Sequence, residues 1–296
     1  MADDESPFQF DFDDDVFLTE RIRSKPETVK VEYEAKQETD GWFHSTKNYE
    51  VLMLERHGPN QLKSAIEHDY LYKRYERALE GALAFIHISD TNPACKINNT
   101  REMCEIAIHS AVRLNNYALA EKILDRKQPT MELGPLLLKG AIYPHCNNRH
   151  GDALASLVDY SQQRRLDYAA WRQMAAIFMD AWTKDKNLNE NPEEMRINIA
   201  FLCLQRAHRI MTSSRWFLKS EFVRRRYERE LKVLVKEMEA VEQGDAGQFV
   251  AWINGPKPNA KAAGLGVYKW KDIEWIACEW TSLFEEEEEQ VKVADL

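Results

Sequence analysis

The densest group of side chains able to bind a metal lies just after Pro144. His145, Cys146 and His150 supply two imidazoles and a thiol, with two asparagines between them. Protein zinc sites usually need three or four ligands, and in sequence they usually come as two paired halves. No second half occurs in this chain, and the stretch falls where a turn between helices is expected. We therefore expect a plain surface turn here, with no metal and no cofactor.

The motifs that usually mark a catalytic centre do not occur. The sequence has no Gly-x-Ser-x-Gly turn, no P-loop, no Gly-x-Gly-x-x-Gly and no His-Glu-x-x-His. The glutamates of Glu285 to Glu289 repel one another too strongly to serve as an acid–base pair in a pocket. The sequence predicts a protein that is not an enzyme. An enzyme stays the weakest of three interpretations, because an active site does not require a known motif.

Three consecutive arginines, Arg224 to Arg226, carry the positive charge needed to contact phosphates or an acidic peptide. Consecutive residues of a helix point about 100° apart, so these three cannot form one flat patch. Glu221, Glu228 and Glu230 lie at distances that allow pairing along a helix. We expect a solvated polar face.

An acidic segment with closely spaced phenylalanines opens the sequence. The phenylalanines are Phe8, Phe10, Phe12 and Phe17, and they alternate with aspartates at 11 and 13–15. Residues 1–41 show no apolar periodicity and are predicted to be disordered until bound. Aromatic side chains in such a segment can insert into an apolar groove while the carboxylates meet basic residues at its rim. Two interpretations stay open: a solvated tail, or a segment that docks on its own chain or on another copy.

Most of the remaining chain is predicted to be helical, with the helices in pairs. Glycine (11) and proline (10) are scarce, which is typical of long helices. Apolar residues at helical spacing predict the pairs 61–72 with 75–85, 102–114 with 117–124, 136–143 with 150–160, and 168–182 with 195–211. An alanine recurs early in each second helix: Ala78, Ala120, Ala153 and Ala200.

This pattern resembles the tetratricopeptide repeat, in which a small residue early in the second helix lets two backbones approach closely. Ala153 follows Ala120 by 33 residues, close to the repeat period of about 34. The resemblance covers residues 61–212, with insertions near 89–100 and 184–194. The chain is similar to a poorly characterised animal family of such proteins in the order of three parts: the acidic segment, the Trp42-Phe43 segment and the helix from Tyr75. This similarity implies no activity. The resemblance implies an all-α superhelix, and a non-repetitive helical bundle is the alternative.

In this repeat class the first helices line the ligand groove. Superposing the repeats places five residues near that face: His68, His109, Arg113, His145 and Arg172. Such a weakly basic surface suits an acidic or aromatic-acidic peptide, the protein's own N-terminal segment included. The Asn and Lys arrangement with which related repeats clamp a C-terminal carboxylate is absent, because those positions hold Ser64, His68, Glu105 and His109. Binding of a chaperone tail is therefore disfavoured.

The flanking regions are predicted from their apolar patterns. Residues 42–60 read as a linker, 213–244 as a long helix that caps the stack, 245–284 as a Trp-rich segment, and 285–296 as an acidic tail. In the final helix, Trp275 points about 160° away from the apolar stripe. It anchors an interface in one interpretation and lies under the preceding loop in the other.

The formal charge of −9 comes from the two ends, and the part between them carries about +4. Five separated cysteines fit reduced thiols in the cytoplasm or nucleus, and the apolar runs are too short to span a membrane.

The sequence thus predicts a non-enzymatic adaptor that binds another protein as a monomer within a complex. The alternative is a helical-repeat RNA- or ribonucleoprotein-binding factor, favoured by the basic middle and scattered aromatics, and opposed by the lack of a contiguous basic stripe.

Overall fold

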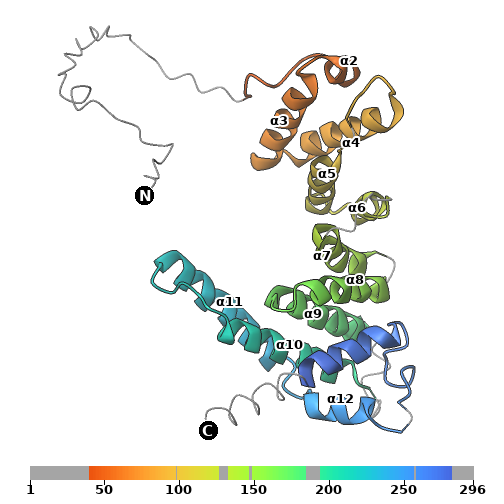
Figure 1. Ribbon diagram of the computed structural model, residues 1–296, viewed down its shortest axis with the longest axis vertical. Helices are drawn as coiled ribbons and strands as arrows, with labels where there is room; N and C mark the ends of the chain where they lie inside the picture. Colours follow the sequence, from red (N-terminus) through yellow and green to blue (C-terminus); the bar gives the residue numbers. More distant parts are fainter. Residues whose placement is uncertain are drawn as a thin grey trace, which may run out of the picture. The chain divides into compact units, whose positions relative to one another are not determined.

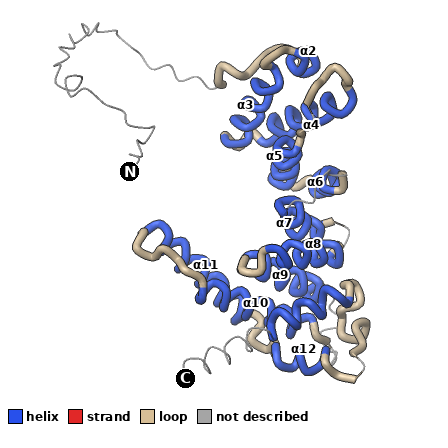
Figure 2. The backbone as a smooth tube through the Cα atoms, in the orientation of Figure 1, coloured by secondary structure: helices blue, strands red, loops and turns tan. Residues whose placement is uncertain are grey.

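The computed structural model describes residues 40–97, 99–126, 133–146, 149–184, 194–256 and 258–281. The chain divides into one unit of residues 1–40 and another of residues 41–296. Phe8, Phe10, Phe12 and Phe17, predicted to dock, lie outside the described residues. Over the described residues every regular element is a helix and none is a strand (Figure 2).

The four predicted helix pairs are present in the second unit (Figure 1). They are α3 (Gly58–Leu71) with α4 (Tyr75–Thr91), α5 (Arg101–Arg113) with α6 (Tyr117–Leu124), α7 (Leu133–Ile142) with α8 (His150–Gln163), and α9 (Tyr168–Lys184) with α10 (Arg196–Ser213). Each helix packs on its partner, and α4, α6 and α8 also pack on the first helix of the next pair. A short 3-10 turn, η1 (Tyr143–His145), follows α7.

The recurring alanines explain the close pairing. Ala78, Ala120, Ala153 and Ala200 have no exposed surface. A larger side chain at any of these positions would push two helices apart, because packed interiors leave no room for extra atoms. The turn between α5 and α6 is also encoded locally. Asn115 adopts a left-handed backbone conformation with φ 57°, and the side chain of Asn116 caps α6 by accepting from the amide of Leu119.

Residues 42–60 are not a linker, which corrects the expectation from the sequence. They contain the six-residue helix α2 (Tyr49–Leu54), capped by the side chain of Asn48. Leu52 and Met53 are each only 2% exposed, and α2 packs on both α3 and α4. A helix of six residues is too short to show a 3.6-residue period, so its apolar residues gave no helical signal.

The long helix α11 (Glu221–Glu239) forms within the range predicted for the capping helix. It packs on α10, with Leu234 buried and Tyr227, Leu231 and Met238 partly buried against the core, while Phe222 near its start is 77% exposed. Beside it, α12 (Ala246–Ile253) also packs on α10. The first turns of α11 and residues 214–220 form the free end of the α10–α11 hairpin (Figure 1).

The segment that follows α12 covers a further part of the apolar core. Residues 258–269 lead into a helix over 270–281, and Ala263, Leu265, Ile273 and Ile276 have no exposed surface. Gly264 makes the bend possible, since its φ is +73° and an added Cβ would lie 2.5 Å from the carboxylate of Glu194. This segment supplies apolar side chains to the same core as α8, α9 and α10.

Candidate binding groove

A groove of about 700 Å³ lies between α7, α9 and the C-terminal end of α11. We call it the α7–α9 groove. Its lining residues are Leu137, Asp167, Ala169, Arg172, Gln173, Ala175, Ala176, Met179, Leu204, Glu237, Ala240 and Val241. The four alanines create the space, because a longer side chain at those positions would fill it. The volume lies in the range of clefts that bind ligands, roughly 300–1,000 Å³.

A second hollow of about 920 Å³ adjoins this groove and shares Leu137 and Asp167 with it. It is lined by the start of α7, the end of α8, the turn between α8 and α9, and residues 214–216. Arg164, Arg165 and Arg215 are exposed along it. An apolar groove therefore continues into a hollow with basic side chains.

The charged groups of the α7–α9 groove neutralise each other. Arg172 donates from Nε to Oε2 of Glu237 and from Nη2 to Oε1, both at 2.6 Å. Glu230 lies 3.8 Å from the same guanidinium. The hydrogen bonds to Glu237 raise the pKa of Arg172 above its ordinary value despite partial burial. Because the cation is paired within the protein, it offers little charge to a ligand.

The other carboxylate of the groove, Asp167, is also occupied. It accepts from the hydroxyl of Tyr160 at 2.6 Å and from the amide of Ala169 at 3.0 Å. Burial, followed by this hydrogen bond, raises the pKa of Tyr160 to about 12, so the phenol stays protonated. The groove is suited to apolar side chains more than to charged ones.

Of the five residues predicted to form the inner face, only Arg172 lines this groove. The ring of His68 stacks on Tyr72 with centroids 4.3 Å apart and touches Phe43 edge-on. His109 lies 6.4 Å from the ring of Tyr70, and partial desolvation lowers its pKa.

The remaining two predicted residues are both exposed. Arg113 is the last residue of α5, and His145 packs its ring 4.7 Å from that of Tyr117. The five residues predicted to share an inner face thus come from α3, α5, η1 and α9, each with its own neighbours. Superposing the repeats could not show this, because residues 41–48 are not part of a repeat. Phe43 and His44 of that segment contact His68 and Asp69 of α3.

Trp275 has a partner inside the protein. Its ring stacks on that of Trp171 in α9, with centroids 5.5 Å apart and planes inclined by 19°. The ring is half-buried, and it stacks on α9. Trp275 lies outside the apolar stripe of the final helix because that helix has apolar contacts on two sides. The side that carries Trp275 faces Trp171 of α9.

His145, Cys146 and His150 do not bring their ligand atoms together. Cys146 is buried and its thiol donates to the carbonyl of Ile142, while Nε2 of His150 lies 2.7 Å from Asp180 of α9. The expectation of a plain surface turn is therefore right for His145 and wrong for the other two. Cys146, whose thiol also lies 3.6 Å from the carbonyl of Tyr117, joins the turn after α7 to the start of α6, and His150 joins α8 to α9.

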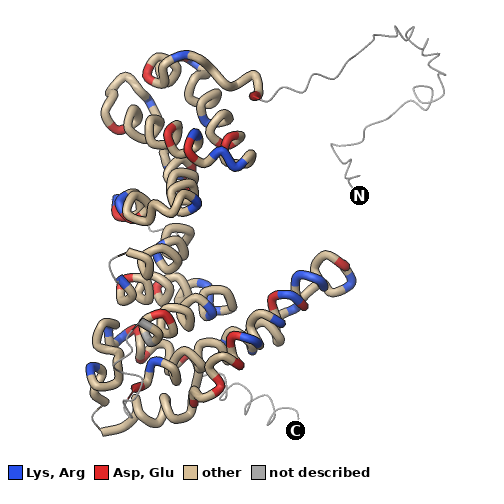
Figure 3. The backbone as a smooth tube through the Cα atoms, turned by 180° about the vertical axis from the view of Figure 1, so that it is seen from behind, with Lys and Arg blue, Asp and Glu red and all other residues tan. Residues whose placement is uncertain are grey.

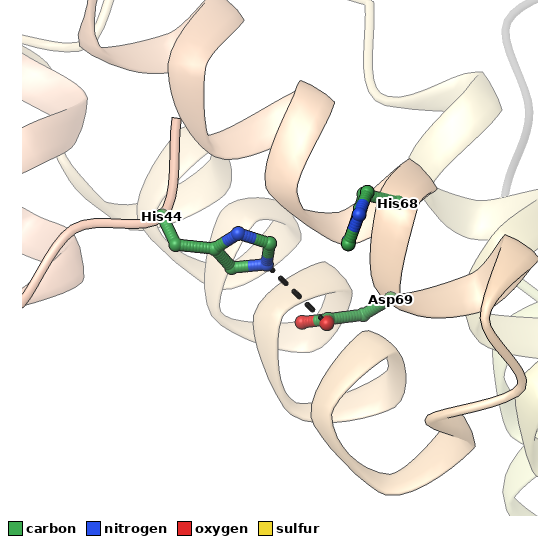
Figure 4. Close-up of side chains that lie close together, drawn as sticks. All are labelled: His44, His68 and Asp69. Atoms are coloured by element: carbon green, nitrogen blue, oxygen red, sulfur yellow. Dashed lines mark hydrogen bonds and ion pairs between the residues drawn. The ribbon is translucent and has the colours of Figure 1, made fainter. Parts of the chain in front are cut away.

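A different cluster, not singled out from the sequence, lies at the first helix pair (Figure 4). His44, His68 and Asp69 each place one possible ligand atom within 4.8 Å of those of the other two. Nε2 of His44 is 3.3 Å from Oδ1 of Asp69. Nδ1 of His68 is buried without a hydrogen-bond partner in the described structure. The spacing of these residues matches no metal motif, so no pattern in the sequence marks them as a cluster.

Two arginines decide how this cluster is interpreted. Arg74 donates to Oδ1 of Asp69 at 3.2 Å, and Nε of Arg77 lies 3.4 Å from Oδ2. A metal ion bound to this carboxylate would be repelled by both guanidinium groups. The cluster is better explained as a polar anchor that fastens residues 41–48 to α3.

Comparison with protein-family models, with curated proteins and with solved structures finds no match for this chain. In the part of the chain that the structure describes, no helix combines the length and the apolar character needed to cross a membrane.

Proposed function

We propose that this protein is a non-enzymatic scaffold or adaptor that binds a segment of another protein in the α7–α9 groove. The helix pairs would form a tetratricopeptide-like superhelix whose first helices face the ligand, and the protein would act in the cytoplasm or nucleus, as one copy within a complex. The observation that carries the proposal is the groove itself, about 700 Å³ in volume and floored by alanines of α9 and Ala240.

The chemistry of the groove supports an apolar anchor. Leu137, Met179 and Leu204 offer apolar surface, while Arg172 is paired with Glu237. Burying apolar surface is worth roughly 25 cal/mol per Å², so one aromatic or aliphatic side chain of a partner could supply much of the affinity.

The adjoining hollow supports acidic residues beside that anchor. Arg164 and Arg215 are exposed there, within the surface that also includes Leu137. Carboxylates flanking an aromatic anchor would meet these side chains. An aromatic-acidic peptide is therefore the ligand class that we propose.

The residues of the groove favour binding over catalysis. The described lining of the α7–α9 groove includes no His, Cys or Ser. Its two carboxylates, on Asp167 and Glu237, are engaged by Tyr160 and Arg172. Neither group is poised as a base for a nucleophile.

The test is to fill the groove without disturbing the core. Ala176 is exposed on α9 and lines the groove, so Ala176→Trp should block it, whereas Ala251→Trp on the exposed face of α12 is the matched control. Affinity capture from native extract, with and without ribonuclease, should recover a stoichiometric protein from the wild type and the control but not from Ala176→Trp.

Two outcomes would contradict the proposal. Capture that is unchanged by Ala176→Trp would remove the groove from the mechanism. Capture that disappears with ribonuclease and weakens steeply with salt would indicate the RNA-binding alternative.

A further inference from the structure

A second surface lies on α11, away from the groove. Phe222, Arg225, Arg226 and Arg229 follow the spacing i, i+3, i+4, i+7, so they share one side of the helix. All four are exposed, and together with Glu221 they line a shallow hollow of about 370 Å³. We call these four residues the Arg–Phe face. Figure 3 shows Lys and Arg gathered along this helix.

This alignment refines what the consecutive arginines indicated. Arg224 does diverge, since it lies about 200° around the helix from Phe222. Arg225 and Arg226 instead align with Arg229, because they precede it by four and three residues, which is about one turn of helix. Four-residue spacing, and not adjacency, decides which arginines share a face.

The Arg–Phe face is not needed to hold α11 in place. Other residues of the helix do that. Tyr227 packs its ring 5.2 Å from Trp216 and Leu234 is buried, and both lie about 120–140° around the helix from Phe222. Glu237, about two turns beyond Arg229, binds Arg172 and lines the α7–α9 groove. The Arg–Phe face is thus a separate surface, and the inference below does not depend on the proposed function.

Apolar groups are exposed next to the charges. Phe222 is 77% exposed and Phe217, in the preceding loop, is 67% exposed. Large apolar side chains grouped on a surface often mark an interaction site. Arg225 pairs with Glu221 and Arg229 with Glu230, whereas Arg226 has no carboxylate within ion-pair distance among the described residues.

The charge pattern narrows the choice of partner. A second copy placed face to face would oppose arginines to arginines, which is destabilising. A long nucleic acid needs an extended basic track, but residues 221–239 hold five glutamates against six Lys and Arg. The Arg–Phe face covers eight residues from Phe222 to Arg229, or roughly 10 Å of helix. This length matches two turns of an opposing helix.

We propose that the Arg–Phe face binds an acidic amphipathic helix of a partner protein. An apolar residue of that helix would cover Phe222, and carboxylates spaced three or four residues apart would meet Arg225, Arg226 and Arg229. Such spacing places carboxylates about 6 Å apart on the partner helix, which suits arginines that are themselves three and four residues apart.

The test measures binding of a defined probe to the full chain. The probe is a fluorescein-labelled 18-residue helical peptide that presents leucines on one stripe and glutamates at four-residue spacing beside it. The comparison probe replaces every glutamate with glutamine. A 20-nucleotide oligouridine is the third probe. Fluorescence anisotropy at physiological salt gives the dissociation constants.

Three variants separate the contributions. The triple variant Arg225→Gln, Arg226→Gln, Arg229→Gln should bind the acidic peptide at least tenfold more weakly than the wild type. Phe222→Ala should bind it at least threefold more weakly. Arg224→Gln, on the same helix but off the face, should change it less than twofold. All these side chains are exposed, so circular dichroism should show the same helical content in each variant.

The proposal is overturned if the acidic peptide does not bind the full chain, or if the triple variant binds it as well as the wild type does. Equal binding of the glutamine peptide would mean that the arginines contribute nothing. Tighter binding of oligouridine through the same arginines would make this face a nucleic-acid surface instead.

Discussion

Asp272 shows how one residue can carry an unfavourable charge inside a stable fold. Its side chain is buried, and Oδ2 has no hydrogen-bond partner within the described structure. Burial raises the pKa of this carboxyl, Lys271 and Lys269 oppose the shift, and Asp159 adds to it. The folded state therefore holds the proton more tightly than the unfolded chain does. The ionised form reduces stability at neutral pH, and this penalty disappears as the pH falls below the unfolded-state pKa of about 4.

We expect Asp272→Asn to raise the free energy of unfolding at pH 7 by about 1 kcal/mol, because an unpaired buried charge is removed. The gain should shrink as the pH approaches 4, where the native carboxyl is itself protonated. Urea denaturation from pH 4 to pH 8 measures it, with Glu242→Gln at an exposed position as the control. A less stable Asn variant at pH 7 would show that the carboxylate has a partner.

At the scale of the elements, α11 is attached to the helix pairs through one side only. Arg172 of α9 and Glu237 of α11 are 65 residues apart and form a two-point ion pair. Tyr227 and Trp216 add an aromatic contact nearer the free end. These contacts determine which side of α11 borders the groove and which side stays exposed.

A double-mutant cycle with Arg172→Lys and Glu237→Gln should give a coupling energy of about 0.5–1 kcal/mol, reduced by added salt. A larger value is not expected, since the two side chains are 34% and 37% exposed. The control cycle uses Arg225→Lys and Glu221→Gln, a more exposed pair within α11, which should couple by less than about 0.5 kcal/mol. Equal coupling in both cycles would mean that the Arg172 pair does not hold α11.

At the scale of the whole second unit, the fold is closed by a contact between distant parts of the chain. The helix over 270–281 packs on α9, which begins about a hundred residues earlier. Trp171, fully buried, receives Trp275 on one face, and Arg206 lies 5.7 Å from its ring centroid. The last helix thus completes the core of α8, α9 and α10.

Trp275→Ala should lower the free energy of unfolding by about 2–4 kcal/mol, because it removes a large half-buried ring and its stack with Trp171. Trp42→Ala provides a matched control at an 82% exposed tryptophan and should change stability by less than about 0.5 kcal/mol. Equilibrium denaturation followed by circular dichroism gives both values. Similar losses in the two variants would contradict the closing role of the last helix.

The sequence by itself determined the four helix pairs, although it did not predict α2 or α12. Apolar residues at helical spacing, the alanine early in each second helix, and the turn at Asn115 and Asn116 act within one or two helices. Such signals are local, because they depend on backbone preferences and on which face of a helix is apolar. The bounds predicted for α6 agree with the structure residue for residue.

Only the tertiary structure decided where the candidate sites lie. Four features join residues far apart in the chain: the α7–α9 groove, the pairing of Arg172 with Glu237, the edge-on contact of His68 with Phe43, and the contact of Trp275 with Trp171. The exposed side of α11 was likewise undetermined, since Phe222 and Leu234 look equally apolar in the sequence. Burial depends on what packs against a helix, and the pattern within that helix does not specify its neighbour.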